Sequence, residues 1–335
     1  MSVTAHSHIV VADDWVGLLT AYCLYQSGHD LSLLWVSNSN KTPNPLLREG
    51  IAPWQAISAP DTKTVQGFEF LMSQLNGVAA QKKGLLSLDV ASAAELDNAE
   101  QWVMSESTQE SDLQVLDEKV WVNIEPRLMS DAKLAIWRPE VAEVARPTFE
   151  HTLLDLLSQQ GVEICLLEDV PSATLKDQRI SVLTSSCGKE WAVDSWVLTS
   201  THLVKSLLPE WPAFHPTESL ISLFKVHPGF LKHLVQVRGL LLMPQDNGLL
   251  YVKRNLSSES TLGLIEVETL LWEALQAVYP EMAMFEPLES IRSHESDFIG
   301  SSPVFENVSV VLTKEDNGLL QAFHQTMQFS KQFNS

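Results

Sequence analysis

The stretch HIVVADDWVGLLTAYCLYQSGHDLSLLWV, residues 8–36, decides the fold. A short β-branched run at 8–11 predicts a buried strand, apolar residues at helical spacing over 16–27 predict a helix, and 31–36 predicts a second strand. Gly28 stands where a helix-ending glycine is expected. Parallel strands need such a helical crossover, so this βαβ unit predicts an α/β sheet.

Hydrophobic periodicity and turn residues predict further elements along the rest of the chain. Helices are predicted over 62–75, 92–103, 148–160, 266–279 and 318–333. Strands are predicted over 120–123, 134–137, 162–167, 178–184, 190–199, 220–226, 234–243, 249–254 and 308–313. The strand-rich middle therefore lies between two α/β parts.

This order of elements predicts two domains. A Rossmann-like, nucleotide-binding domain is expected from residues 1–80, 140–215 and 290–335. An antiparallel, β-rich insert is expected from 81–139 and 216–289. The predicted class is therefore α/β with an α+β insert.

The chain of 335 residues carries 22 basic and 42 acidic residues, a formal net charge of −20. Such a chain repels phosphate backbones and anionic lipids, so we expect no nucleic acid and no membrane among its partners. No apolar run approaches the roughly 20 residues that span a bilayer. The first residues lack the basic segment of a signal peptide, and we expect a cytoplasmic protein.

The three cysteines, Cys23, Cys165 and Cys187, are too few and too scattered for a disulfide framework or a zinc site. All three stand in apolar or strand-like stretches, so buried structural thiols are expected. The sequence offers no metal-ligand spacing and no nucleophile motif. We therefore predict no metal site and assign no catalytic residue.

Four stretches, in this order along nearly the whole chain, resemble the FAD-dependent D-amino-acid oxidase family, especially its glycine oxidase-like members. They are HIVVADDWVGLLTAYCLYQSGHDLSLLW at 8–35, TFEHTLLDLLSQQGVEI at 148–164, DSWVLTSTHLVKSLLPE at 194–210 and IRSHESDFIGSSPVFENVSVVLTKEDNGLL at 291–320. The resemblance implies an FAD-binding, Rossmann-like domain with an inserted substrate-type domain. It also implies FAD as the cofactor and oxidation of an amine or amino acid as the activity.

The first cofactor-binding position of that family is changed here. The family's Gly-x-Gly-x-x-Gly fingerprint is matched by residues 12–17, ADDWVG, and only Gly17 remains of its three glycines. That third glycine lets helix and strand pack closely. Asp14 stands at the second glycine, where its carboxylate repels a diphosphate. We interpret Asp14, with its neighbour Asp13, as a helix N-cap in place of a phosphate cradle.

Three further positions that the resemblance assigns to FAD are also changed. Trp35 replaces the acidic residue that binds the ribose, and its bulk suits the adenosine cavity. Thr201 stands at the glycine of an Ala-Gly pair. The late glycine-rich loop is matched by residues 313–316, where Lys314 lies, and only Gly318 remains nearby.

Arg292 is kept in a segment, SIRS, that resembles the family's carboxylate-binding arginine context. A guanidinium suits a carboxylate because it donates two parallel hydrogen bonds. In a chain with 20 excess acids, a structural salt bridge is the alternative interpretation.

Three functions follow from these observations. The favoured one is a degenerate oxidase-like protein, a pseudoenzyme without conventional FAD binding that acts as an accessory or binding subunit with a protein partner or as a homo-oligomer. The second is an active FAD-dependent oxidoreductase that oxidises an amine or amino acid. The third is a binding protein in which Arg292 holds a small carboxylate.

Overall fold

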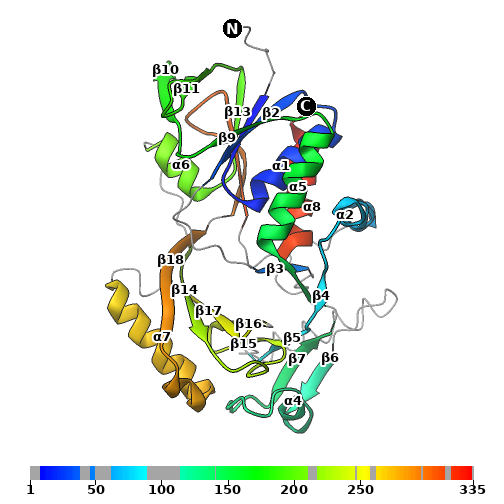
Figure 1. Cartoon of the computed structure of the whole chain (residues 1–335), viewed down its shortest axis with the longest axis vertical. Helices are drawn as coiled ribbons and strands as arrows, with labels where there is room; N and C mark the ends of the chain where they lie inside the picture. Colours follow the sequence, from blue (N-terminus) through cyan, green and yellow to red (C-terminus); the bar gives the residue numbers. More distant parts are fainter. Residues whose placement is uncertain are drawn as a thin grey trace.

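Two large β-sheets, one above the other in the view of Figure 1, form the framework of the protein. The computed structural model describes residues 8–37, 46–49, 62–88, 114–139, 141–209, 217–245, 247–256, 262–295, 297–313 and 318–333. Helices flank the upper sheet on both faces, and the lower sheet is curved with helices on its outer side (Figure 1).

The upper sheet has six strands, and its centre is the predicted βαβ unit. In spatial order they are β19 (Phe298–Ser301), β20 (Val308–Leu312), β13 (Ser195–Leu198), β1 (His8–Ala12), β2 (Leu31–Val36) and β9 (Glu163–Leu167). All neighbours are parallel except β19, which runs antiparallel to β20. In β1, Ile9 and Val10 are 2% and 0% exposed and belong to core clusters on opposite faces. The predicted Rossmann-like sheet is confirmed.

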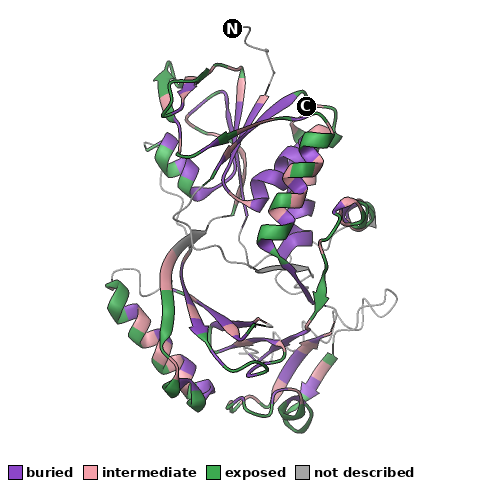
Figure 2. Cartoon of the chain, viewed as in Figure 1, coloured by how far each residue is buried: buried purple, intermediate pink, exposed green. Residues whose placement is uncertain are grey.

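Helices and a small sheet cover the two faces of this sheet. One face carries α1 (Trp15–Gln26), α2 (Thr62–Gln74), α5 (Arg146–Gln159) and α8 (Gly318–Gln332). The other carries α6 (Thr201–Leu207) and the small sheet of β10 (Ser172–Lys176), β11 (Arg179–Thr184) and β12 (Glu190–Trp191). Both faces of the central strands are consequently buried, as Figure 2 shows.

The lower sheet has eight strands and is largely antiparallel. In spatial order they are β18 (Pro287–Glu295), β14 (Thr217–Lys225), β17 (Leu249–Asn255), β16 (Leu240–Pro244), β15 (Leu234–Val237), β5 (Leu85–Ser87), β7 (Leu134–Arg138) and β6 (Gln114–Asp117). Helices α4 (Glu118–Ile124) and α7 (Leu264–Val278) and the 3-10 helix η1 (Pro280–Met284) pack on its outer face. A further small sheet joins β3 (Leu46–Glu49), β8 (Ala142–Ala145) and β4 (Gln81–Lys82).

Several predicted elements differ in the structure. The strand predicted over 120–123 is wrong, because these residues lie in α4, which Asp117 caps by accepting the N–H of Val120 at 3.1 Å. The strand predicted over 234–243 is a hairpin of β15 and β16, whose turn places Arg238 and Gly239 at positive φ.

Other differences concern strand membership. The stretch 190–199 contributes to two sheets, since β12 pairs with β11 and β13 pairs with β1. β18 and β19 were not predicted. β18 continues across residue 290, so the domain boundary predicted there falls inside a strand. The helix predicted over 92–103 lies outside the described residues.

Candidate functional site

The carboxyl ends of β1, β2, β13 and β20 meet at one edge of the six-stranded sheet, because these strands are parallel. Ligands of open α/β sheets bind at this edge. The sequence-predicted residues Asp14, Trp35, Thr201 and Gly318 belong to the strands and following segments that end here. Lys314 lies outside the described residues.

Asp14 is the N-cap of α1, as predicted. Its backbone is extended, with φ −147° and ψ 172°. Its Oδ1 accepts the backbone N–H of Gly17 at 3.0 Å, while its own carbonyl accepts the same group at 3.1 Å. A side-chain carboxylate therefore stands where the positive end of the helix dipole would otherwise attract an anion.

Asp13 places a second carboxyl group beside the cap, and it is only 6% exposed. A diphosphate at this helix start would meet the Asp14 carboxylate. Two like charges about 4 Å apart repel by about 4 kcal/mol in a partly shielded site. The residues present therefore do not fit a dinucleotide diphosphate in the usual position of this fold.

Packing requires glycine at position 17. A Cβ at this position would lie 2.2 Å from Cβ of Ala12 and 2.4 Å from Oγ1 of Thr199. The Thr199 hydroxyl is itself fixed, since it donates to the carbonyl of Val11 at 3.1 Å. The one surviving fingerprint glycine thus holds α1 against β1 and β13, independently of any ligand.

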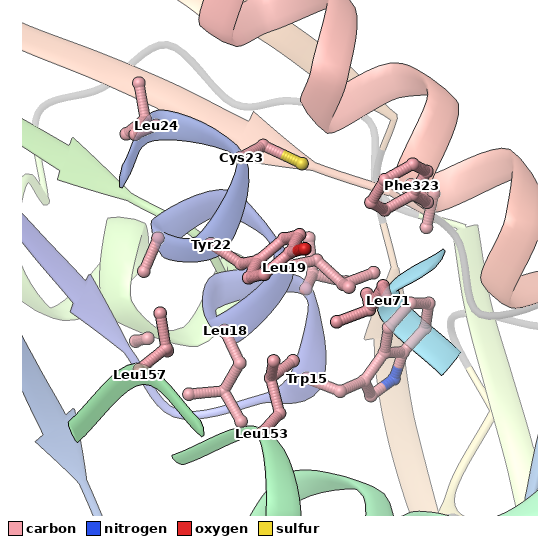
Figure 3. Close-up of a cluster of buried hydrophobic side chains, with 14 of the residues drawn as sticks. Trp15, Leu18, Leu19, Tyr22, Cys23, Leu24, Leu71, Leu153, Leu157 and Phe323 are labelled. Atoms are coloured by element: carbon pink, nitrogen blue, oxygen red, sulfur yellow. The ribbon is translucent and has the colours of Figure 1, made fainter. Parts of the chain in front are cut away.

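Helix α1 is buried almost all around, beyond the one apolar face that the predicted helical spacing implied. Ten of its twelve residues are buried, including Trp15 at 1% exposure. Figure 3 shows Trp15 of this helix in one apolar cluster with Leu71 of α2 and Phe323 of α8. The large indole at the start of the helix is therefore part of the core.

The other predicted cofactor positions also have internal roles. Trp35 is half-buried and packs against the α1 cluster, so its bulk occupies the end of β2. Thr201 begins α6 and is 8% exposed. The preceding Ser200 caps α6 by accepting the N–H of Leu203 at 3.1 Å. Gly318 is the buried first residue of α8, at φ 76°.

Arg292 lies on the α7 face of the eight-stranded sheet. It stands opposite Leu220 of β14, whose side chain belongs to the cluster beneath α7. Its guanidinium donates to the carbonyl of Leu262, just before α7. On the other side of Leu220, Arg254 donates likewise to the carbonyl of Leu270 at 2.7 Å. The two arginines thus tie α7 to the sheet through backbone carbonyls.

The opposite face of this sheet holds two buried cations that sequence reasoning missed. Lys253 is 2% exposed and pairs across the strands with Ile221 and Leu241, which share an apolar cluster. Arg138 is 7% exposed and stands opposite Leu85 of the same cluster. Strand alternation through 249–255 was the available signal for Lys253, because it places position 253 on one face with Tyr251.

The cysteines are only partly as predicted. Cys23 is buried beside Thr326, and burial raises the pKa of its thiol to about 12. Cys165 is half-buried. The prediction is wrong for Cys187, which is exposed; its hydrogen bond with Ser185 lowers the pKa of the thiol.

The described residues contain neither a group of metal-binding side chains nor a membrane-spanning helix. In that part of the chain, no three His, Cys, Asp or Glu side chains are grouped to hold a metal ion. Among its helices, none has the length and apolar character needed to cross a membrane.

Solved structures with the same architecture identify the fold. Glycine oxidase from Bacillus cereus ATCC 14579 aligns with 98% of this chain and 95% of its own at a TM-score of 0.68 and 13% identity. The chain has the glycine oxidase fold. L-proline dehydrogenase from P. horikoshii aligns with a TM-score of 0.73 and 12% identity, over 98% of this chain and 93% of that chain.

The same fold is found in iminodiacetate oxidase from Chelativorans sp. BNC1, with a TM-score of 0.65 and 16% identity over 97% of this chain and 93% of that chain. No protein-family model matches the sequence, and no curated protein matches it. At these identities the likeness establishes the glycine oxidase fold, and the chemistry must be argued from the residues.

Proposed function

We propose that this chain is a non-catalytic accessory or binding subunit with the glycine oxidase fold, a pseudoenzyme that does not hold FAD in the usual way. The observation that carries the proposal is the Asp14 carboxylate on the N–H of Gly17, 3.0 Å away. It gives the start of α1 an internal anion at the place where the fold's dinucleotide diphosphate binds.

Two further positions support the same proposal. Trp35 offers no acceptor to a ribose hydroxyl and packs on the α1 cluster. At the next strand end, Ser200 and Thr201 give α6 its own cap and a buried first residue. These positions contact different parts of an extended dinucleotide in the resembled family, so their unfavourable contributions add.

The test is to express the full chain with ample riboflavin, record its visible spectrum, and follow its melting temperature with added FAD. We expect colourless protein and no change in melting temperature. A ligand present at about 100 times its Kd stabilises a protein by about 2.7 kcal/mol. A clear rise in melting temperature, or a flavin spectrum after purification, contradicts the proposal and favours the active FAD-dependent oxidoreductase.

The small-carboxylate alternative is tested in the same assay. Arg292 already donates to the Leu262 carbonyl on the outer face, so we expect no stabilisation by acetate, glycine or pyruvate. Stabilisation that depends on Arg292 would favour a carboxylate-binding protein.

We also propose that the two large sheets correspond to two domains, with β18 in the inserted domain. The separate core clusters that lie beneath the two sheets support this division.

We further propose that the protein works in the cytoplasm, because its unpaired cysteines suit a reducing compartment.

A further inference from the structure

The outer wall of the eight-stranded sheet, formed by α7, η1 and the edge strand β18, carries an excess of negative charge. Its residues 262–286 contain five glutamates and no lysine, arginine or histidine. The glutamates are Glu266, Glu268, Glu273, Glu281 and Glu286. Three arginines lie at this wall. Arg292 of β18 and Arg254 of β17 bind backbone carbonyls before and within α7, and Arg127 lies 3.5 Å from Glu281. The five glutamates outnumber these three arginines, so the wall remains acidic.

Exposed apolar side chains lie at both ends of the same wall. In the described residues ten large apolar side chains are exposed, and four of them lie here: Leu264 at 42%, Ile265 at 78%, Met284 at 73% and Leu288 at 60%. The first two begin α7, and the last two lie beyond its end, in η1 and at the start of β18. Figure 2 shows exposed and half-buried residues along α7 and exposed residues at the start of the adjoining strand β18. Exposed apolar side chains beside a strand edge favour an interaction site there.

β18 adds a third feature, a strand edge. Within the part of the chain that the structure describes, its nine residues pair on one side only, with β14. The other edge of such a strand offers backbone N–H and C=O groups to a further strand. An added strand would lay alternate side chains beside Leu288 and the glutamates of α7.

Charge decides what can dock there. A second copy of this chain would bring five glutamates against five, which opposes self-association. We propose that the wall binds an extended segment of a partner protein in which lysine or arginine alternates with apolar residues, by strand addition to β18. The proposal supplies the partner surface of the accessory role proposed above and rests on that role.

A synthetic peptide serves as the probe. It is an acetylated Lys-Val alternating peptide of nine residues, the length of β18, titrated by fluorescence anisotropy against the full chain. One control peptide has Glu for Lys. A second is the Lys-Val peptide with N-methylated backbone amides, which keeps its charge and loses strand pairing. We expect binding of the Lys-Val peptide alone and slower hydrogen exchange in β18 on binding.

Two charge-matched variants test the location. Glu273 and Glu286 are exposed on the wall, and Glu168 and Asp169 are exposed after β9. We expect Glu273→Lys with Glu286→Lys to weaken peptide binding about tenfold, and Glu168→Lys with Asp169→Lys to leave it nearly unchanged.

Three results would overturn the proposal. If both double variants lose the same amount of peptide affinity, or if the N-methylated peptide binds as tightly as the Lys-Val peptide, the binding reflects general attraction to an acidic protein. Unchanged exchange in β18 would show binding elsewhere. Self-association that the wall variant abolishes would assign the wall to a second copy. None of these readouts involves FAD, so their failure is separate from a failure of the cofactor proposal.

Discussion

Converting residues 12 and 14 back to glycine should not restore FAD binding. In the double variant Ala12→Gly with Asp14→Gly, the carboxylate on Gly17 is gone and both lost fingerprint glycines return. Removing a repulsion of about 4 kcal/mol would tighten FAD binding by about a thousandfold if that charge were the sole obstacle. Trp35 and the capped α6 start remain, so we expect Kd to stay above about 100 μM.

The assay is isothermal titration of the double variant with FAD, after a melting curve has shown that it folds. Glycine is itself a fair N-cap, so the loss of the Asp14 cap should cost only a few tenths of a kcal/mol. Asp14→Asn is the matched control, because it keeps a cap oxygen and removes the charge. A Kd near 1 μM in the double variant would refute the reasoning, since it would confine the obstacle to the turn after β1.

Four further outcomes follow from the structure. Gly17→Ala should lower the free energy of unfolding by about 2 kcal/mol in urea titrations, through overpacking against β1 and β13. Arg292→Met should lower it by about 1–2 kcal/mol, through the lost α7 anchor, and leave melting temperatures with small carboxylates unchanged. Cys187 should react with a disulfide reagent in native protein at moderately alkaline pH, because its thiol pKa is lowered, while Cys23 should react only on unfolding. Burial raises the pKa of the Glu125 carboxyl in the folded protein above 4.5, its ordinary value in an unfolded chain. Ionisation of Glu125 therefore lowers the stability of the parent protein as the pH rises above 4.5. The Glu125→Gln variant should gain stability relative to the parent between pH 4.5 and neutrality, as measured by denaturation at each pH.

The centre of the fold was predictable because its signals are local. The residues of β1, α1 and β2 form nearly continuous apolar runs separated by polar residues and Gly28, a pattern typical of strands and a helix that are buried on all sides. The Asp14 cap joins groups three residues apart, so its geometry follows from the sequence itself. These features needed no knowledge of distant pairing.

Features set by distant contacts were not predictable in the same way. The face on which Arg292 lies depends on the register that sets it opposite Leu220, more than 70 residues earlier in the chain. β18 is an exposed edge strand with the sequence PLESIRSHE, so burial does not impose a clear alternation of apolar residues. In α4 the Val-Trp-Val run favoured a strand, but tertiary packing and the Asp117 cap outweighed that propensity.

Under the proposed function, Asp14 both opposes FAD and stabilises the protein without it. A helix that begins at a sheet edge has unsatisfied N–H groups, which an FAD diphosphate would otherwise engage. Here Asp14 engages one of them, a contribution of about 1 kcal/mol. Trp15 fills the space beside the helix start at 1% exposure, and burial of such a side chain contributes about 3 kcal/mol. Under the proposed function, a glycine oxidase fold without its cofactor needs such substitutions, because each contact once made by the ligand leaves a polar group or a cavity in the core. That requirement explains why carboxylate and indole side chains, in place of small neutral ones, follow β1.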